Sequence, residues 1–103
     1  MTHSSDSTYG RHVAEDRRLV ILHVLGNSAG YQANEYTLEA MLEELGHTVS
    51  NDQVRSELAW LAEQSLIETR SIGGVTIATV TRRGLDVARG KAHQPGVKRP
   101  QPV

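Results

Sequence analysis

Residues 46–61 read GHTVSNDQVRSELAWL, and this stretch decides the fold. Gly46 ends one helical segment, and Ser50 with Gln53 three residues later forms a capping box that begins the next. In this second segment, apolar residues recur on one helix face, at Val54, Leu58 and Leu61. The connection from Gly46 to Val49 is as short as the turn of a helix-turn-helix. The stretch therefore predicts two helices joined in that way.

Upstream of the turn, two further apolar patterns predict helices. Asn34 is placed to cap a helix whose apolar residues have helical spacing, at Leu38, Met41, Leu42 and Leu45. Residues 12–26 form an earlier helix whose second half is apolar almost all round. Because a helix wetted on one side needs only an apolar stripe, we expect this one to be covered on two sides. We expect a second subunit to supply one cover, in a two-fold homodimer through Leu19, Leu22, Leu25 and, from the last helix, Leu85.

Downstream, the period of the pattern changes from helical to two. This pattern predicts a β-hairpin, with one strand from Leu66 to Ile72, a turn at Gly73 and Gly74, and a second strand over 75–81, which is rich in Val, Ile and Thr. Thr81 is placed to cap a short helix that ends before Gly90. The sequence therefore predicts an α+β fold, a winged helix-turn-helix with three helices, a two-stranded hairpin as the wing and a short C-terminal helix. We expect a flexible N-terminus over 1–10, this domain over 11–90, and a disordered, basic, Pro-containing tail over 91–103.

Composition excludes several classes of protein. At 103 residues with 38% hydrophobic residues, the chain has material for one core. It contains no cysteine, and its five histidines show no pair at metal-ligand spacing, so we expect neither a disulfide nor a metal site. We expect no enzyme and no cofactor, because nucleophile motifs and phosphate loops are absent from the sequence. The longest apolar run, residues 19–25, is too short to span a membrane, and no export signal opens the chain, so a cytoplasmic protein is expected.

Charge is divided sharply along the chain, although the net charge is only −1. Residues 31–68 contain eight acidic residues and one arginine. Residues 69–103 contain seven basic residues and one acidic residue. A polyanion would therefore be drawn to the C-terminal third of the chain.

The segment from Asp52 to Leu61, followed by Leu66 and Ile67, resembles winged-helix regulators of the ArsR and MarR type. A closer similarity is to small winged-helix proteins of Mu-like phages and prophages, carried by residues 46–50 (GHTVS), 81–88 (TRRGLDVA) and 95–100 (PGVKRP). The resemblance implies a phage or prophage protein acting in a bacterial host cell. It transfers no biochemical role. Genes of this group tend to lie near those for lysis and DNA packaging, which leaves a role in morphogenesis open.

The helix that follows the turn is expected to be the recognition helix, because helices of this kind enter the major groove of DNA. The predicted DNA contacts come from this helix, the wing, the last helix and the tail: Asn51, Gln53, Arg55, Ser56, Arg70, Arg82, Arg83, Lys98 and Arg99. Solvated surfaces would make alanine substitutions at Arg55 and Arg70 nearly neutral, within about 0.5 kcal/mol. Asp52 and Glu63 point outward from the same helix and oppose phosphate binding.

Two functions follow from these patterns. The first is a DNA-binding protein acting on double-stranded DNA, as a phage or prophage transcriptional regulator. The alternative is an interaction module that binds another protein, in morphogenesis, packaging or host-factor binding, through its acidic second and third helices. The positions of four arginines in the folded protein distinguish these two functions. Convergence of Arg55, Arg70, Arg82 and Arg83 on one surface favours DNA, and a continuous acidic face favours a protein partner.

Overall fold

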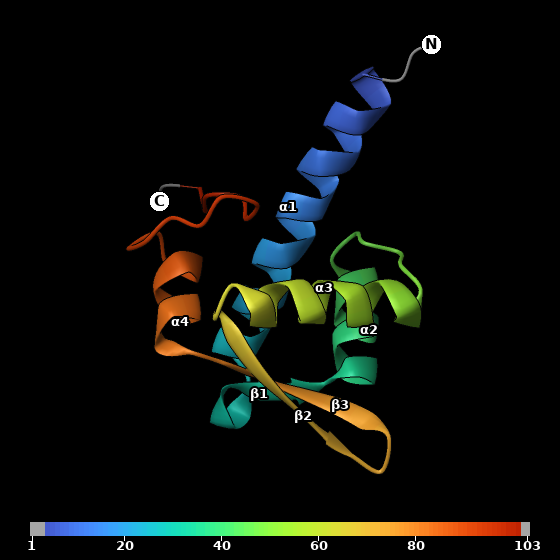
Figure 1. Cartoon of the computed structure of the whole chain (residues 1–103), viewed down its shortest axis with the longest axis vertical. Coiled ribbons are helices and arrows are strands. Elements are labelled where there is room, and N and C mark those ends of the chain that lie inside the picture. Colours follow the sequence, from blue (N-terminus) through green and yellow to red (C-terminus); the bar gives the residue numbers. More distant parts are fainter. Residues whose placement is uncertain (1–3, 102–103) are drawn as a thin grey trace.

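The chain folds as an α+β domain, shown in Figure 1. The computed structural model describes residues 4–101, with side chains from residue 8 onward. Its elements are helices around a small antiparallel sheet, in the order α1 (Ser4–Gly26), η1 (Ala29–Tyr31), β1 (Gln32–Asn34), α2 (Glu35–Glu44), α3 (Asn51–Glu63), β2 (Ile67–Ile72), β3 (Val75–Val80) and α4 (Arg82–Ala88). This order is compatible with the predicted winged helix-turn-helix.

Three side-chain caps fix where the later helices begin. Asn34 Oδ1 accepts from the backbone N–H of Tyr36 and Thr37 at 2.9 Å each. Ser50 Oγ accepts from Gln53 N at 3.1 Å. Thr81 Oγ1 accepts from Gly84 N at 3.0 Å, and it also donates to the carbonyls of residues 65 and 66. All three predicted caps are confirmed, because each side-chain oxygen satisfies an N–H that has no partner within its helix.

The sheet has the order β1-β3-β2. The predicted hairpin is confirmed, with Ile72 opposite Val75 and Ile67 opposite Val80. Gly73 and Gly74 make its turn with φ of 58° and 81°, which glycine adopts without steric cost. The third strand, β1, has no counterpart among the elements predicted from the sequence. A strand of three residues is too short to show a period of two, and it forms because Ala33 pairs with Ala78 on the free edge of β3.

The core lies between α1, α2, α3, α4 and the sheet, and it is closed within one chain. Leu19, Leu22 and Leu25 are 6%, 0% and 0% exposed in the monomer. Helix α1 packs against α2, α4 and β3, and Leu85 of α4 lies against Gly26. The expectation that these leucines need a second subunit is therefore wrong. The sequence shows that a helix is covered on several sides, but it does not show that its own chain supplies the covers.

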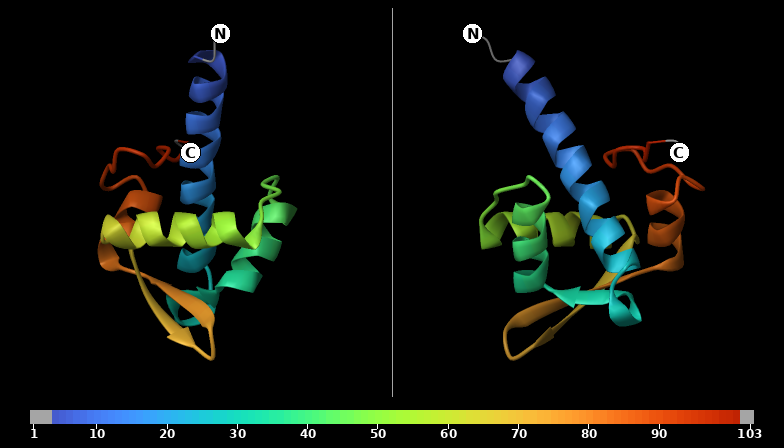
Figure 2. Two further views of the ribbon diagram at one scale, coloured as in Figure 1. Left: turned by 45° about the vertical axis from the view of Figure 1, so that its right-hand side comes forward. Right: turned by 180° about the vertical axis from the view of Figure 1, so that it is seen from behind.

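Both predicted ends of the domain are corrected by the structure. Helix α1 begins at Ser4, so the segment predicted to be flexible is helical from residue 4, and residues 1–3 lie outside the described residues. The segment after α4 is not a disordered tail over 91–101. It turns back so that Val97 is 3% exposed, and the backbone N–H of Lys98 donates to the Glu15 carbonyl at 3.1 Å. Figure 2 shows this segment returning beside α1. Residues 102–103 lie outside the described residues.

Candidate functional site

The carboxylate of Glu35 is the centre of a buried network between α2, α3 and the hairpin. Its side chain is fully buried at the first position of α2. Arg55 donates to both oxygens, from Nε at 2.7 Å and Nη2 at 3.0 Å, and the backbone N–H of Thr76 donates at 2.6 Å. Asn51 Nδ2 adds a bond of 3.0 Å. The Arg55 guanidinium and then the Thr76 amide hold the pKa of Glu35 at about 2, so the carboxylate is charged at neutral pH.

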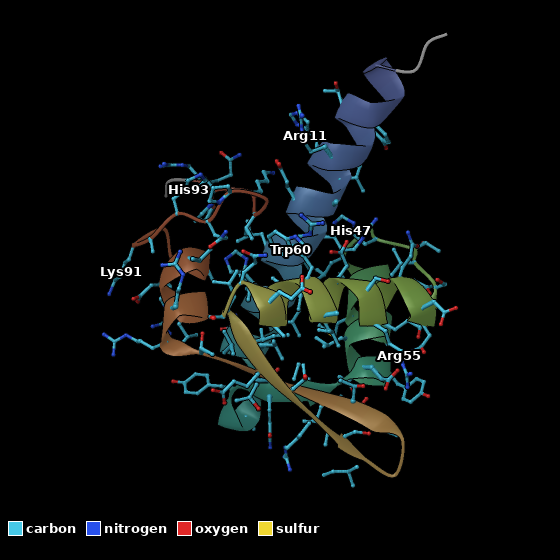
Figure 3. The ribbon with its side chains drawn as sticks, viewed as in Figure 1. Arg11, His47, Arg55, Trp60, Lys91 and His93 are labelled. Carbon is cyan, nitrogen blue, oxygen red and sulfur yellow. The ribbon has the colours of Figure 1, made fainter. Side chains whose placement is uncertain are left out.

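Two of the predicted DNA contacts are therefore structural residues. Asn51 and Arg55 were expected on a solvated helix face, but both turn toward Glu35. Arg55 Nη2 also donates to the Gly74 carbonyl at 3.0 Å, so one guanidinium joins α2, α3 and the hairpin turn. Its side chain is 48% exposed, and Figure 3 shows it beside α2, on the side of α3 that faces the hairpin turn. Sequence reasoning missed Glu35, although its spacing to Leu38 and Leu42 places it on the buried face of α2.

The outward face of α3 carries no free cation among its described side chains. Its exposed residues are Asp52, Gln53, Arg55, Ser56, Ala59 and Glu63, and Arg55 is bound to Glu35. Gln53 and Ser56 are exposed, as the predicted contacts require. Two carboxylates on the same face would repel a phosphate backbone. The acidic character of this helix is thus greater in the structure than in the sequence.

The other predicted cations lie apart from Arg55. On the sheet, Arg70 Nη2 donates to Gln32 Oε1 at 3.1 Å. On α4, Arg82 pairs with Asp86 at 3.6 Å, and Arg83 donates to Gln94 Oε1 at 3.0 Å. Figure 3 shows Arg55 and Lys91 on opposite sides of the molecule. The four arginines that would mark a DNA-reading surface are therefore divided between the α2–hairpin side and α4.

A second buried carboxylate, Glu57 of α3, anchors α1 and the C-terminal segment. Arg17 Nη1 and Arg18 Nε each donate to it at 2.7 Å. Arg18 also donates to the Gly96 carbonyl at 2.9 Å and lies 4.1 Å from the centre of the Trp60 ring. Gly96 sits so close to Trp60 that a Cβ there would be 2.6 Å from Cζ2 of the ring. Sequence reasoning assigned no role to Arg17 or Arg18, and it placed Gly96 in a disordered tail.

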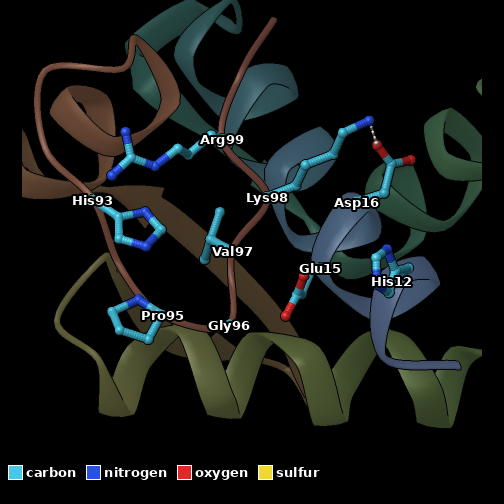
Figure 4. Close-up of a pocket in the computed structure, with 9 residues that line it drawn as sticks. All are labelled: His12, Glu15, Asp16, His93, Pro95, Gly96, Val97, Lys98 and Arg99. Carbon is cyan, nitrogen blue, oxygen red and sulfur yellow. Dashed lines mark hydrogen bonds and ion pairs between the residues drawn. The ribbon is translucent and has the colours of Figure 1, made fainter. Parts of the chain in front are cut away.

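This anchored segment borders a hollow of about 510 Å³ against α1, shown in Figure 4. Lys98 Nζ pairs with Asp16 at 3.3 Å, and His47 Nε2 contacts the other oxygen of Asp16 at 2.7 Å. Lys98, predicted to be part of a mobile arm, is thus held at a fixed place beside α1. Arg99 lines the same hollow, is exposed, and has no ion pair to a carboxylate within residues 4–101.

Two surfaces of opposite charge result from these contacts. The α2 face is defined by six exposed residues of that helix and its C-cap, Tyr36, Ala40, Met41, Glu43, Glu44 and Leu45. The α1–α4 groove is a hollow of about 1120 Å³ with apolar residues Leu19, Val20 and Ala88 at its floor and cations Arg89, Lys98 and Arg99 on its rim. Acidic residues from the middle of the chain and basic residues from its C-terminal third thus form two separate surfaces.

The described residues offer no membrane or metal site. Among residues 4–101, none of the helices is both long and apolar enough to cross a membrane. The same part of the chain holds no group of three or more histidine or acidic side chains placed to bind a metal ion.

Comparison with known proteins places the chain among phage proteins. No protein-family model matches it. The uncharacterized protein gp26 of Escherichia phage Mu is 48% identical over 90 residues, which cover 87% of this chain and 93% of gp26. An uncharacterized protein of Haemophilus influenzae is 42% identical over 74 residues, covering 71% of this chain and 72% of that protein. The predicted relation to Mu-like phage proteins is confirmed, and the chain belongs to the family of phage Mu gp26.

Proposed function

We propose that this protein is a winged-helix interaction module that binds a protein partner through the α2 face. The order of elements supports the winged-helix assignment: a long helix, a short edge strand, two helices joined by residues 45–50, and a hairpin paired to that strand. The hairpin is the wing in this assignment, and α3 is in the position of a recognition helix.

The observation that carries the proposal is the use of Arg55. A recognition helix that reads DNA needs its cations and amides directed outward. Here the guanidinium of Arg55 and the amide of Asn51 are bound to Glu35, and the side chains left outward include Asp52 and Glu63. The neighbouring α2 face combines carboxylates with exposed apolar side chains, and Tyr36 is 54% exposed. Aromatic and methionine side chains are enriched at protein interfaces.

Site-specific photo-crosslinking tests the proposal. A benzophenone amino acid replaces Tyr36 on the α2 face, and in a control it replaces Tyr9, a more exposed tyrosine of α1. With the chain expressed from its own genome, we expect the Tyr36 position to form an adduct with an identifiable protein and the Tyr9 position to form none. Adding Glu43→Gln and Glu44→Gln should abolish the adduct. An adduct with nucleic acid, or equal adducts at both positions, would overturn the proposal.

Double-stranded DNA is the second candidate partner, through α4 and the C-terminal segment rather than α3. Arg89, Lys91 and Arg99 are exposed, and within residues 4–101 no ion pair joins them to a carboxylate. Each phosphate neutralised on a duplex steepens the fall of log affinity with log salt by roughly 0.9. Replacing all three cations by glutamine should then flatten that slope by up to about 2.7. Arg70→Gln, which removes a cation from the sheet, is the control and should leave the slope unchanged.

A further inference from the structure

We infer that the α2 face of one copy of this protein docks into the α1–α4 groove of a second copy, so that copies associate head to tail. The inference rests on the proposed function, because it names the partner of the α2 face. It replaces the two-fold contact through α1 that the sequence suggested, since the leucines of that contact are buried in the monomer.

The groove has the chemistry of a site for an acidic and apolar surface. Leu19 and Val20 of α1 and Ala88 of α4 give it an apolar floor. Arg89 and Arg99 are on its rim and have no carboxylate partner within the part of the chain that is described. Asp16 also borders the groove, but its carboxylate is already neutralised by Lys98 and contacts His47. The groove therefore has excess positive charge beside an apolar surface. Such an arrangement favours a partner that carries negative charge beside an apolar surface.

The α2 face carries both negative charge and apolar surface. Glu43 and Glu44 are exposed, and within residues 4–101 neither has an ion pair. Tyr36, Ala40 and Met41 provide apolar surface on the same helix. At 100° per residue, Tyr36, Ala40 and Glu44 follow one another along a single outward row, with Met41 and Glu43 on either side of it. Two carboxylates and an apolar row thus face outward together, against two guanidinium groups and an apolar floor.

The two surfaces cannot meet within one copy. Figures 1 and 2 show α2 on one side of the molecule and α4 with the C-terminal segment on the other, in every view. The segment that forms the rim is fixed in place by Arg18 on the Gly96 carbonyl and by the bond between Lys98 N and Glu15 O. Both surfaces are therefore built before association, and only a second copy brings them together.

Such a contact is heterologous, because it joins two different surfaces, and a pair of copies joined in this way leaves one surface of each kind unused. Association then continues until a ring closes or a filament grows. A two-fold dimer would stop at two copies. This difference makes the inference testable by counting subunits.

The experiment uses full-length protein and measures molar mass by light scattering over a range of concentrations at low salt. The face variant is Glu43→Gln with Glu44→Gln, and the groove variant is Arg89→Gln with Arg99→Gln. Wild type should form species larger than dimers, and each variant alone should associate at least tenfold more weakly. A one-to-one mixture should form a dimer and stop there, because the groove of the face variant and the α2 face of the groove variant are both intact.

Matched controls remove the same charges elsewhere. Glu63→Gln with Glu68→Gln, and Arg70→Gln with Arg82→Gln, change exposed residues outside both surfaces. They should associate like wild type. A wild-type protein that stays monomeric up to hundreds of micromolar, or a mixture of the two variants that remains monomeric, would overturn the inference. In that event a Tyr36 adduct with another protein would still support the proposed function, so the two failures are distinguishable.

Discussion

Glu35 and Glu57 are both buried carboxylates on helices, but their charges are balanced in different ways. Glu35 has a single cation, Arg55, and its other donors are neutral, the amide of Asn51 and the backbone N–H of Thr76. Glu57 has two cations, Arg17 and Arg18, both from α1. The first carboxylate joins α2 to α3 and the hairpin, and the second joins α1 to α3 and, through Arg18, to the C-terminal segment.

The difference shows which arginines are available for binding. Arg17, Arg18 and Arg55 hold the fold together, although charge counting along the chain treats them like any other cation. The exposed cations that remain without a carboxylate are concentrated on α4 and in the segment after it. Helix α3 therefore has its single arginine bound to a buried carboxylate, while exposed cations without a carboxylate remain on the α4 side of the molecule.

Among residues 4–101, Arg55 is the only cation bound to Glu35, and removing it should have the largest effect on stability. Arg55→Ala leaves a buried carboxylate without a charged partner, and we expect the Tm to fall by on the order of 15 °C. Thermal unfolding followed by circular dichroism measures this. Adding Glu35→Gln should recover part of the loss, because the amide needs no counter-charge. An Arg55→Ala protein as stable as wild type would mean that Arg55 is a surface residue, as the sequence suggested.

The same carboxylate should make stability depend on pH. The pKa of Glu35 is lowered from 4.5 to about 2 in the folded protein, because Arg55 and the Thr76 amide favour the charged form. The charged carboxylate of Glu35 therefore contributes fully to the free energy of unfolding above pH 4.5. This contribution is lost as pH falls from 4.5 toward 2. Unfolding curves over this range should fall more steeply for wild type than for Glu35→Gln. Parallel curves would show that Glu35 is not held in its charged form.

Displacing the C-terminal segment should have the next largest effect. At Gly96 φ is +95°, and a Cβ would meet the ring of Trp60, so Gly96→Ala combines backbone strain with a clash. We expect the Tm to fall by about 10 °C and the Trp60 emission to shift to the red. Gly46→Ala is the matched control, because Gly46 has the same φ of +95° and no atom within 4 Å of a Cβ. Equal losses in the two variants would mean that the contact with Trp60 contributes nothing.

At Glu57, the loss of one cation should matter less than at Glu35. Arg17→Ala leaves Arg18 beside the carboxylate, so the buried charge keeps a partner. We expect the Tm to fall by about 5 °C. Replacing both arginines should cost more than the sum of the two single losses, since only the double variant leaves Glu57 without a cation. A double variant with simply additive losses would show that each arginine acts independently of the other.

The sequence was sufficient for the elements whose signals are local. Caps at Asn34, Ser50 and Thr81, and a hairpin turn at Gly73 and Gly74, each depend on a few neighbouring residues, and all are present. The errors concern contacts between distant residues. Strand β1 pairs with the edge of β3, and the C-terminal segment is held by contacts of Gly96 with Trp60 and Arg18 and by the bond between Lys98 N and Glu15 O. The fold class was therefore predictable, while the ends of the domain were not.

At the candidate site, too, the sequence did not predict the contacts between residues that are distant along the chain. On a helical wheel Arg55 lies on a flank of α3, about 90° from the centre of the face formed by Val54, Leu58 and Leu61. Its long side chain nevertheless reaches the buried carboxylate, and Asn51, nearer to that face, binds the same carboxylate. A wheel gives the direction of Cβ and not the position of a guanidinium group. The spacing of Glu35 to Leu38 and Leu42 could have indicated its burial, but its partners come from positions 51, 55 and 76, which no local pattern connects to it.

The smallest effect is expected at Arg70, and it completes the comparison with Arg55. Both are arginines predicted to contact DNA, but Arg70 is exposed on β2, and its side chain donates one hydrogen bond of 3.1 Å to the exposed Gln32. Because no buried charge depends on it, Arg70→Ala should change the Tm by less than about 3 °C. The contrast with the loss of on the order of 15 °C at Arg55 is the informative quantity, since the two substitutions remove the same atoms. If Arg70→Ala proved as costly as Arg55→Ala, stability would depend on the total positive charge rather than on the carboxylate that a given arginine reaches.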